Sequence, residues 1–467
     1  MKRKLLLSNL TLLINLSIFH FSTNAQNALF TDHGFIPMSQ VTASVDFQTA
    51  IYIDPYVFVA TDDGIWKNNL NTREWTAAGL QGKSIKCLYK HPTLANKLFA
   101  GAYITEDPNY PRPNRIPLYL SNDGGASWNP ATNPLNKNYN CFAARPNHPD
   151  HIYANVDATN IGFSTDGNNW VLINNINGGD VGSTSPILFT AGNSNHLYIG
   201  SETPLDDAWL GRYRIDNSNP ILLSDFNKVV RGGSGPWSNR RPNRLQTYPF
   251  TPNTIYAGLE GALAKVKDTV MTFIYKANSG DATKPYVYIK SIWVDPSDTN
   301  HIIFGGFAKN EASSGVYQMS LMETYNEGAT FHRYTNNFNV ADPWICDMVD
   351  LGDEKIGIII SDMTTGNRKV KLLIMQPQVI TSKERAFSND QISISPIPSN
   401  DVIRLEYRSI ESTSFELKLY NSFGHEVYQS LSETEIKAID ISPLDNGVYY
   451  LHLNIDGKVL VKKISKI

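Results

Sequence analysis

The chain has little of what marks several large classes of protein. Only 3 of its 467 residues are cysteine, so disulfides cannot be the framework of the fold. Charged residues make up 18% and the formal net charge is -3, whereas a domain that binds nucleic acid is usually strongly basic. Asp62-Asp63-Gly64 lacks the rest of a calcium loop. We therefore expect no nucleic-acid partner, no metal site and no cofactor.

Long apolar runs are also scarce. The longest, residues 5–21, is interrupted by two Asn and one His, which makes a poor membrane span. It follows the basic residues 2–4 and precedes the small-residue site Thr23-Asn24-Ala25. This pattern predicts a secretory signal peptide over residues 1–25; a membrane anchor is the alternative. No later segment is apolar enough for a transmembrane segment.

Patterns with the period of a helix are rare, and residues typical of strands and turns are common. The sequence has 23 Tyr, 20 Phe and 8 Trp, together with 31 Gly and 25 Pro. Aromatic residues favour strands, and Gly and Pro favour the turns between them. This composition predicts an all-β fold.

A short stem recurs in which a polar turn runs into an apolar strand, as in KHPTLANKLFAG, TAGNSNHLYIG and YPFTPNTIYAG. Seven copies align, with steps from 41 residues (Ile51 to Pro92) to 58 residues (Ala191 to Pro249). Repeats of roughly 40–50 residues made of short strands are typical of β-propeller blades. The sequence therefore predicts a seven-bladed β-propeller.

The repeat register aligns the three cysteines, Cys87, Cys141 and Cys346, and puts Ser291 at the same place in another repeat. We expect each of them on the innermost strand of its own blade, as a small residue packed near the channel wall. A disulfide between Cys87 and Cys141 is the alternative.

The plan of domains follows from the repeats. The last repeat has one strand after Ile360, and residues 28–35 are strand-like, so we expect this segment to complete the last blade and cover its edge. The signal peptide (1–25) would precede the propeller (26–376) and a polar linker (377–390). Residues 391–467 alternate polar and apolar side chains, which predicts a small Ig-like antiparallel β-sandwich.

The C-terminal segment carries a set of short motifs. They are Pro396-Ile397-Pro398-Ser399, Tyr420-Asn421-Ser422-Phe423-Gly424, Ile439-Asp440-Ile441, Leu444 with Gly447-Val448-Tyr449, and Lys462-Lys463-Ile464-Ser465-Lys466. In these motifs the segment resembles the type A C-terminal sorting domain of the type IX secretion system of Bacteroidetes. Ile397 departs from the pattern, since the family usually has Asn there. The resemblance implies the type IX machinery as a partner and a secreted protein, extracellular or on the outer-membrane surface, with the domain either removed or used as the anchor.

A second set of residues lies in the turns of the repeats. One turn has Ser121, Asp123, Gly125 and Trp128, and another has Ser164, Asp166 and Trp170. A third turn keeps the spacing but has less typical residues at these positions: Thr324, Asn326, Gly328 and Phe331. These turns resemble the Asp boxes (BNR repeats) of sialidases, sortilin-type receptors and xyloglucanases. The side chains in such a box bond backbone groups within the turn, so we expect a structural role, on the side away from the binding face.

The longest loops occupy other places in the repeats. AYITEDPNYPRPNR, SETPLDDAWLGR and FAKNEASS each follow a second strand, and RGGSGPWSNRRPNR links two blades. In a propeller these connections gather at one end of the channel, where Asp342 and Trp344 should also approach. The candidate ligand-binding residues of this end are Tyr110, Arg112, Arg115, Asp206, Asp207, Trp209, Arg231, Trp237, Arg240 and Arg241.

This mixture of side chains suits a carbohydrate, because aromatic rings stack on sugars and Arg binds acidic groups in a bidentate manner. One hypothesis is a surface propeller that binds a glycan or a protein. The alternative is a secreted glycoside hydrolase or polysaccharide lyase that uses a carboxylate pair or a Tyr/His/Arg set on the same face. No spacing singles out a catalytic residue.

Two specific enzyme classes fit the sequence poorly. Arg115-Ile116-Pro117 matches the Arg-Ile-Pro of sialidases, but it runs directly into Ser121 and so enters a third strand instead of an early one. Enzymes of the xyloglucanase type typically need two propellers that face each other across a cleft, and only one fits in this chain.

Overall fold

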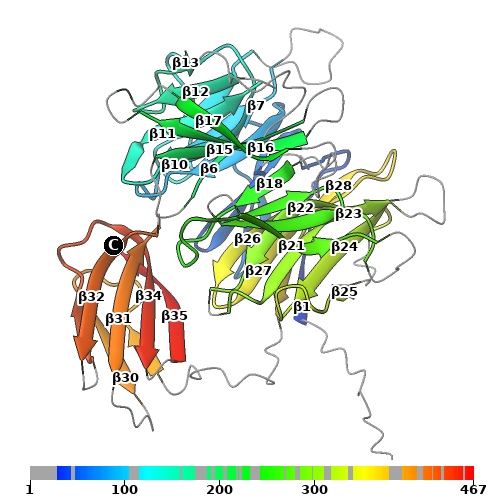
Figure 1. Cartoon of the computed structure of the whole chain (residues 1–467). Coiled ribbons are helices and arrows are strands. Elements are labelled where there is room, and N and C mark those ends of the chain that lie inside the picture. Colours follow the sequence, from blue (N-terminus) through cyan, green and yellow to red (C-terminus); the bar gives the residue numbers. More distant parts are fainter. Residues whose placement is uncertain are drawn as a thin grey trace, which may run out of the picture.

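The computed structural model describes residues 29–43, 48–104, 115–157, 160–173, 187–190, 195–202, 208–216, 219, 223–231, 242–267, 270–278, 284–296, 298–309, 317–334, 340–377, 392–407, 414–422, 424–432, 436–455 and 458–467. Within these ranges every regular element is a β-strand, and the strands form seven four-stranded antiparallel sheets and a smaller unit of two sheets (Figure 1). No helix in this part of the chain has the length and hydropathy to cross a membrane.

The first four blades follow the chain in order. Blade 1 contains β2 (Ala50–Ile53), β3 (Tyr56–Thr61), β4 (Gly64–Asn69) and β5 (Trp75–Ala77). Blade 2 contains β6 (Ile85–Lys90), β7 (Leu98–Ala102), β8 (Leu118–Ser121) and β9 (Asn129–Pro130). Blade 3 contains β10 (Tyr139–Arg145), β11 (His148–Val156), β12 (Asn160–Ser164) and β13 (Val171–Ile173). Blade 4 contains β14 (Ile187–Phe189), β15 (His196–Glu202), β16 (Ala208–Ile215) and β17 (Leu223–Arg231).

The last three blades include the one sheet whose strands are not consecutive. Blade 5 contains β18 (Pro242–Gln246), β19 (Thr254–Leu259), β20 (Ala262–Lys267) and β21 (Val270–Lys276). Blade 6 contains β22 (Val287–Val294), β23 (Ile302–Lys309), β24 (Tyr317–Thr324) and β25 (His332–Tyr334). Blade 7 contains β26 (Pro343–Gly352), β27 (Lys355–Asp362), β28 (Lys369–Gln376) and the N-terminal strand β1 (Leu29–Phe35).

The blades form a closed ring, which confirms the predicted seven-bladed propeller. The first strand of each blade contacts the first strands of both neighbours, and β26 of blade 7 contacts β2 of blade 1. Strand β1 pairs with β28 from Leu29 opposite Gln376 to Phe35 opposite Lys371, so the N-terminal segment completes the last blade as expected. This pairing covers the edge that β28 would otherwise expose.

The hydrophobic core is divided among the contacts between blades. Seven clusters of buried side chains among the described residues each join two neighbouring blades. The cluster between blades 7 and 1 contains Ile359, Val370 and Leu372 from one side and Val57 and Trp66 from the other. Because both faces of a middle blade are covered, its inner strands have no polar face: all five residues of β7 are buried. The closed ring is thus what buries the apolar surface of each sheet.

The glycine that ends several repeat stems permits close packing of blades. A Cβ atom on Gly101 would lie 2.3 Å from the carbonyl oxygen of Tyr139 in the next blade. A Cβ on Gly258 would lie 2.7 Å from Ile289, again in the next blade. Only glycine allows the first strand of the following blade to approach so closely.

The turns that match the Asp-box pattern make the expected hydrogen bonds. The Ser121 hydroxyl accepts from the Gly125 amide at 2.8 Å, and the Asp123 carboxylate accepts from the amide and hydroxyl of Ser127. These hydrogen bonds hold the pKa of Asp123 low, at about 2. The Ser164 and Asp166 side chains bond their own turn in the same way.

These turns also contact the preceding blade. The Trp128 indole donates a 2.8 Å hydrogen bond to the carbonyl of Ala78 in blade 1. Gly125 has a positive φ of 87°, and a Cβ there would lie 2.8 Å from the ring of Phe58, also in blade 1. The turn with Gly125 and Trp128 therefore fastens blade 2 to blade 1.

The cysteines lie on first strands, as predicted, but one of them was aligned wrongly. Each of these strands contains a bulge of one extra residue. The first residue that pairs with the second strand after the bulge is Cys87, Cys141, Ser291 or Asp347. Cys346 is the extra residue of its bulge, so Asp347 takes the place that the repeat alignment assigned to Cys346. None of the three cysteines forms a disulfide, so the alternative of a Cys87–Cys141 disulfide is not found.

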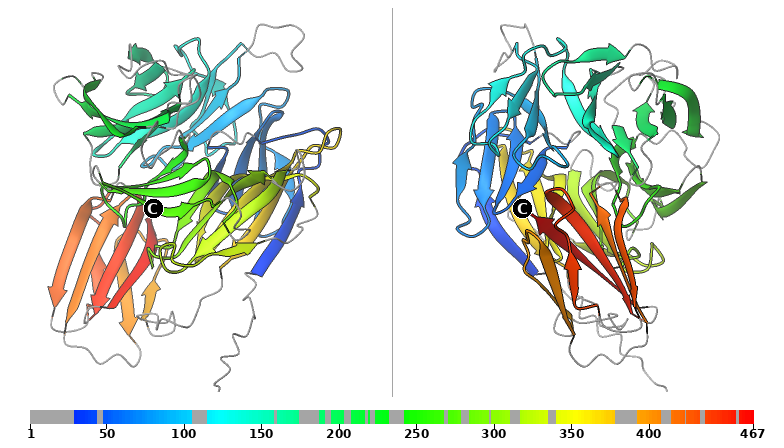
Figure 2. Two further views of the ribbon diagram at one scale, coloured as in Figure 1. Left: turned by 45° about the vertical axis from the view of Figure 1, so that its right-hand side comes forward. Right: turned by 90° about the vertical axis from the view of Figure 1, so that its left-hand side faces the viewer.

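The C-terminal unit is a β-sandwich with its own core. One sheet contains β29 (Ile392–Ser395), β30 (Val402–Tyr407) and β33 (Ala438–Asp440). The other contains β32 (Glu426–Ser432), β31 (Phe415–Asn421), β34 (Gly447–Ile455) and β35 (Lys458–Lys466). The two sheets enclose a single cluster that includes Leu405, Leu417 and Leu453. In Figures 1 and 2 the sandwich, orange to red, lies against one side of the propeller.

The fastening role of the turns can be tested with two neighbouring glycines. Gly125→Ala should destabilise the protein by ~2–4 kcal/mol, because a strained φ and a clash with Phe58 add together. Gly124→Ala is the matched control: its φ is 70°, but the nearest atom to its Cβ is 3.6 Å away, so only the ~1–2 kcal/mol of backbone strain remains. Urea unfolding measures both variants, and equal losses would contradict a contact between blades at this turn.

Candidate functional site

The structure allows the two ends of the propeller to be told apart. We call the end with the second-to-third-strand and blade-to-blade connections the loop-rich end, and the other, with the Asp-box turns, the opposite end. The long insertions fall between β7 and β8, β15 and β16, β23 and β24, and β17 and β18, which is where the sequence predicted them. All four therefore belong to the loop-rich end.

Three of the predicted ligand-binding residues are among the described residues. Arg115 is exposed and precedes β8, so its Arg-Ile-Pro motif enters a third strand, as predicted. Trp209 and Arg231 are opposite each other on β16 and β17. The other seven lie outside the described residues: Tyr110, Arg112, Asp206, Asp207, Trp237, Arg240 and Arg241.

Aromatic rings are stacked at the loop-rich end of blades 6 and 7. Tyr288 of β22 and Phe307 of β23 are opposite each other, with ring centroids 4.9 Å apart and planes 15° apart. Trp344, at the start of β26, stacks on Phe307 at 4.1 Å and 20°. Tyr288 and Trp344 are each partly exposed, whereas Phe307 is buried. We call these three rings the aromatic stack.

Two carboxylates lie beside the aromatic stack, and they differ in role. Asp362 accepts hydrogen bonds from the amides of Ala341, Asp342 and Thr364 and from the Thr364 hydroxyl, and its pKa is lowered in spite of burial. Asp342 accepts one from the Trp344 indole at 3.3 Å. Burial, with the nearby Asp362 charge, raises the pKa of Asp342. Asp362 therefore fixes the loop, and Asp342 is the carboxyl group whose pKa is raised.

A smaller polar group lies at the same end of blades 2 and 3. The Lys86 ammonium is 4.7 Å from the centre of the Tyr103 ring. Asn138 accepts from the Ile104 amide and bonds Asp157, which also pairs with Lys137 at 2.8 Å. The loop-rich end thus presents rings and charged groups on two sides of the channel.

A charge network lies inside the channel, and the sequence did not predict it. The fully buried Asp347 carboxylate is 2.9 Å from the Arg244 guanidinium and accepts from the amides of Thr49 and Ala50. Burial raises the pKa of Asp347, and Arg244 and the backbone amides oppose that rise. The network ties the first strands of blades 7, 5 and 1 together. An unpaired charge would be costly at this depth, which indicates a structural role.

A pocket of about 320 Å³ lies at the opposite end, between the propeller and the sandwich. Its propeller wall comes from the ends of first strands, including Tyr89 and Lys90 of β6 and Asp350 of β26. Its other wall comes from Val448, Tyr450 and Lys463 of the sandwich, together with Ser422. We call it the domain-junction pocket. No sequence signal could have found it, because its walls come from segments far apart in the chain.

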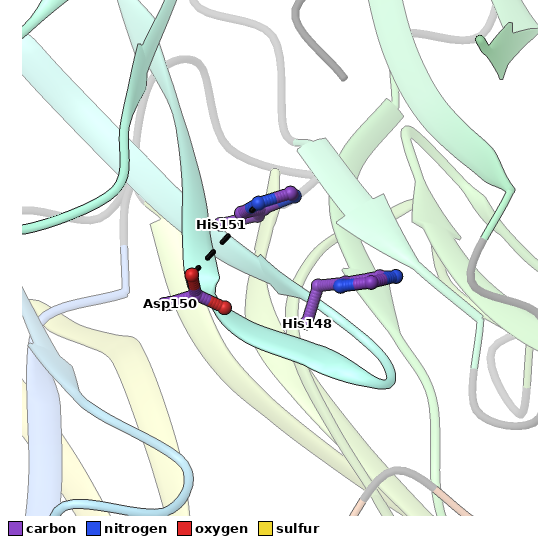
Figure 3. Close-up of side chains that lie close together, drawn as sticks. All are labelled: His148, Asp150 and His151. Atoms are coloured by element: carbon purple, nitrogen blue, oxygen red, sulfur yellow. Dashed lines mark ion pairs between the residues drawn. The ribbon is translucent and has the colours of Figure 1, made fainter. Parts of the chain in front are cut away.

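One group of side chains has the chemistry of metal ligands. His148, Asp150 and His151 on β11 have candidate ligand atoms within 4.8 Å of one another (Figure 3). The two imidazole rings are stacked, with centroids 4.9 Å apart and planes 15° apart. A metal ion lies near the plane of each imidazole that binds it, and stacked planes cannot share one ion. A ring would have to rotate before this group could bind a metal.

Comparison with known proteins identifies the C-terminal unit. Residues 393–466 match the family model described as the secretion system C-terminal sorting domain. The chain therefore ends in a sorting domain of type IX secretion, which implies interaction with that machinery and export to the cell surface or the extracellular space. No curated protein matches the chain.

Solved structures resemble the chain in fold at low sequence identity. The GH74 xyloglucanase from Xanthomonas campestris has 13% identity and a TM-score of 0.52, over 73% of this chain and 55% of that one. YCF48 bound to D1 peptide has 10% identity and a TM-score of 0.44, over 75% of this chain and 100% of that one. The chain thus spans about half the length of the xyloglucanase, and the likeness supports the propeller fold alone.

The channel network gives a direct stability test. Asp347→Asn should cost ~3 kcal/mol, because it leaves the Arg244 guanidinium without its counter-charge. Arg244→Met should also destabilise the protein, and the double variant should lose less than the sum of the single losses, since the two side chains interact. Denaturant unfolding of all four proteins measures this coupling. Additive losses would mean that the ion pair contributes nothing to the ring.

Proposed function

We propose that this type IX-exported propeller binds a glycan at its loop-rich end. The observation that carries the proposal is the aromatic stack of Tyr288, Phe307 and Trp344 with the Asp342 carboxyl beside it. Partly exposed aromatic rings offer sugar rings an apolar face, and a neighbouring carboxylate accepts hydrogen bonds from hydroxyl groups. Export beyond the outer membrane brings such a surface into contact with polysaccharides.

The position of the sorting domain supports this choice of end. The sandwich contributes residues to the domain-junction pocket at the opposite end, so it leaves the loop-rich end uncovered. The connections that vary most in length between blades also belong to this end. Loops carried on a rigid scaffold are the usual place for binding residues.

An alternative is a polysaccharide-active enzyme at the same end, and one observation favours it. The pKa of Asp342 is raised by burial and by Asp362, which is the change that a general acid needs. Asp362, however, is engaged by three backbone amides and a hydroxyl, which leaves it poorly suited to act as the second carboxylate.

The binding proposal is tested by changing Trp344. A glycan array with the mature chain, meaning residues 26–467 without the predicted signal peptide, should identify ligands. Trp344→Ala should weaken their binding at least tenfold, which corresponds to ~1.4 kcal/mol. Trp344→Phe, which keeps an aromatic face, should lose only a few-fold. Tyr56→Ala, which removes a partly exposed ring at the opposite end, is the control and should bind as the wild type does. The absence of any glycan ligand, or equal binding by Trp344→Ala, would overturn the proposal.

Asp342→Asn separates binding from catalysis. If the site only binds, acidification should release glycan from the wild type at a higher pH than an Asp of ordinary pKa would give. The raised pKa lets Asp342 take up its proton at that higher pH. Asp342→Asn should remove this pH step, and no glycan should be cleaved by either protein. Cleavage that disappears in Asp342→Asn while binding persists would establish the enzyme instead.

A further inference from the structure

The domain-junction pocket is a distinct site at the other end of the propeller. Its volume of about 320 Å³ falls within the range of small-molecule sites. Tyr52 and Tyr89 line it from the propeller and Tyr450 lines it from the sorting domain. The Tyr450 ring also contacts Phe250 of the propeller, with centroids 6.1 Å apart. The two domains therefore meet at the pocket and build it together.

The charges that face this pocket are mostly positive. Lys90, at the end of β6, and Lys463, on β35, contribute one ammonium group from each domain. Among the described residues, neither ammonium has a carboxylate within 4.0 Å. Burial, with the charge of Lys463, lowers the pKa of Lys90, so the two groups are close enough to repel each other. Bringing these two like charges together costs free energy.

The other titratable groups do not balance this charge. Arg244 is neutralised by Asp347 at 2.9 Å. His91 accepts amide hydrogens of Thr93 and Leu94 at Nδ1, and burial lowers its pKa to about 4, so it is neutral.

Asp350 is the one carboxylate among the residues that line the pocket, and it accepts a hydrogen bond from the Gly352 amide. Burial, and then the charge of Asp350, raises the pKa of Tyr450 on the sorting-domain wall. With Lys90 and Lys463 both charged, one positive charge remains uncompensated.

We propose that the domain-junction pocket binds an anionic group carried on a sugar-sized molecule, held between the Lys90 and Lys463 ammonium groups. A phosphate, sulfate or carboxylate supplies this chemistry. The anion offsets the repulsion between the two lysines, and the tyrosine rings border the body of the ligand. Since one lysine comes from each domain, the bound anion also joins the sorting domain to the propeller.

The test uses the full mature chain and four related sugars. Isothermal titration with glucose 6-phosphate, glucose 6-sulfate and glucuronate, each at constant ionic strength, determines which anion fits, and glucose is the uncharged control. We expect at least one charged sugar to bind and glucose not to bind. Lys90→Gln and Lys463→Gln should each weaken binding at least tenfold, and the affinity should fall as salt is added.

Two controls keep the outcome specific. Lys267→Gln removes an exposed lysine on β20 outside the pocket and should bind as the wild type does. Trp344→Ala should also bind normally, because its effect belongs to the loop-rich end, so this proposal and the glycan proposal can fail separately. Equal binding of glucose, unchanged binding by the two pocket variants, or no binding of any charged sugar at millimolar concentration would overturn the proposal.

Discussion

The antiparallel pairing of β1 with β28 joins the two ends of the propeller chain, and the other features of the molecule depend on it. It is reinforced from both sides: the buried Lys371 ammonium lies 2.7 Å from the Asp32 carboxylate, and the Trp75 indole of blade 1 donates to the carbonyls of His33 and Gly34. Because the ring is closed, each blade is packed against two neighbours. Closure also gives the propeller two separate ends.

The closed ring explains why the interior can hold charges and why the two ends differ. Asp347 and Arg244 are buried together because first strands from separate blades meet at the channel. At the loop-rich end the connections between strands differ in length, and the aromatic stack lies near the ends of β22, β23 and β26. At the opposite end the turns are short and the sorting domain packs against them. One end is thereby suited to an external ligand, and the other to contact within the chain.

Much of the architecture could be predicted from the sequence because it depends on local patterns. The repeated stems marked the blades, and spare strand sequence near Phe35 predicted the closure. The alignment of Cys346 was wrong because the hairpin after this strand is shorter in blade 7: Asp347 pairs with Ile359, 12 residues on, whereas Cys87 pairs with Gly101, 14 residues on. Neither the ion pair with Arg244 nor the domain-junction pocket could be predicted, since both depend on which distant strands meet. The ligand-binding roles given to the loop residues stay predictions.

The central claim is that the sorting domain covers one end of the propeller and leaves the other free. Hydrogen exchange, followed by mass spectrometry on the mature chain with and without residues 392–467, tests it directly. Removing the sorting domain should speed exchange in peptides that contain Tyr89–Pro92 and Gln246–Phe250, which line or border the domain-junction pocket. Peptides that contain Tyr286–Lys290 and Asp342–Ile345 should be unchanged. Unchanged exchange at the first pair, or an equal change at both ends, would contradict the account.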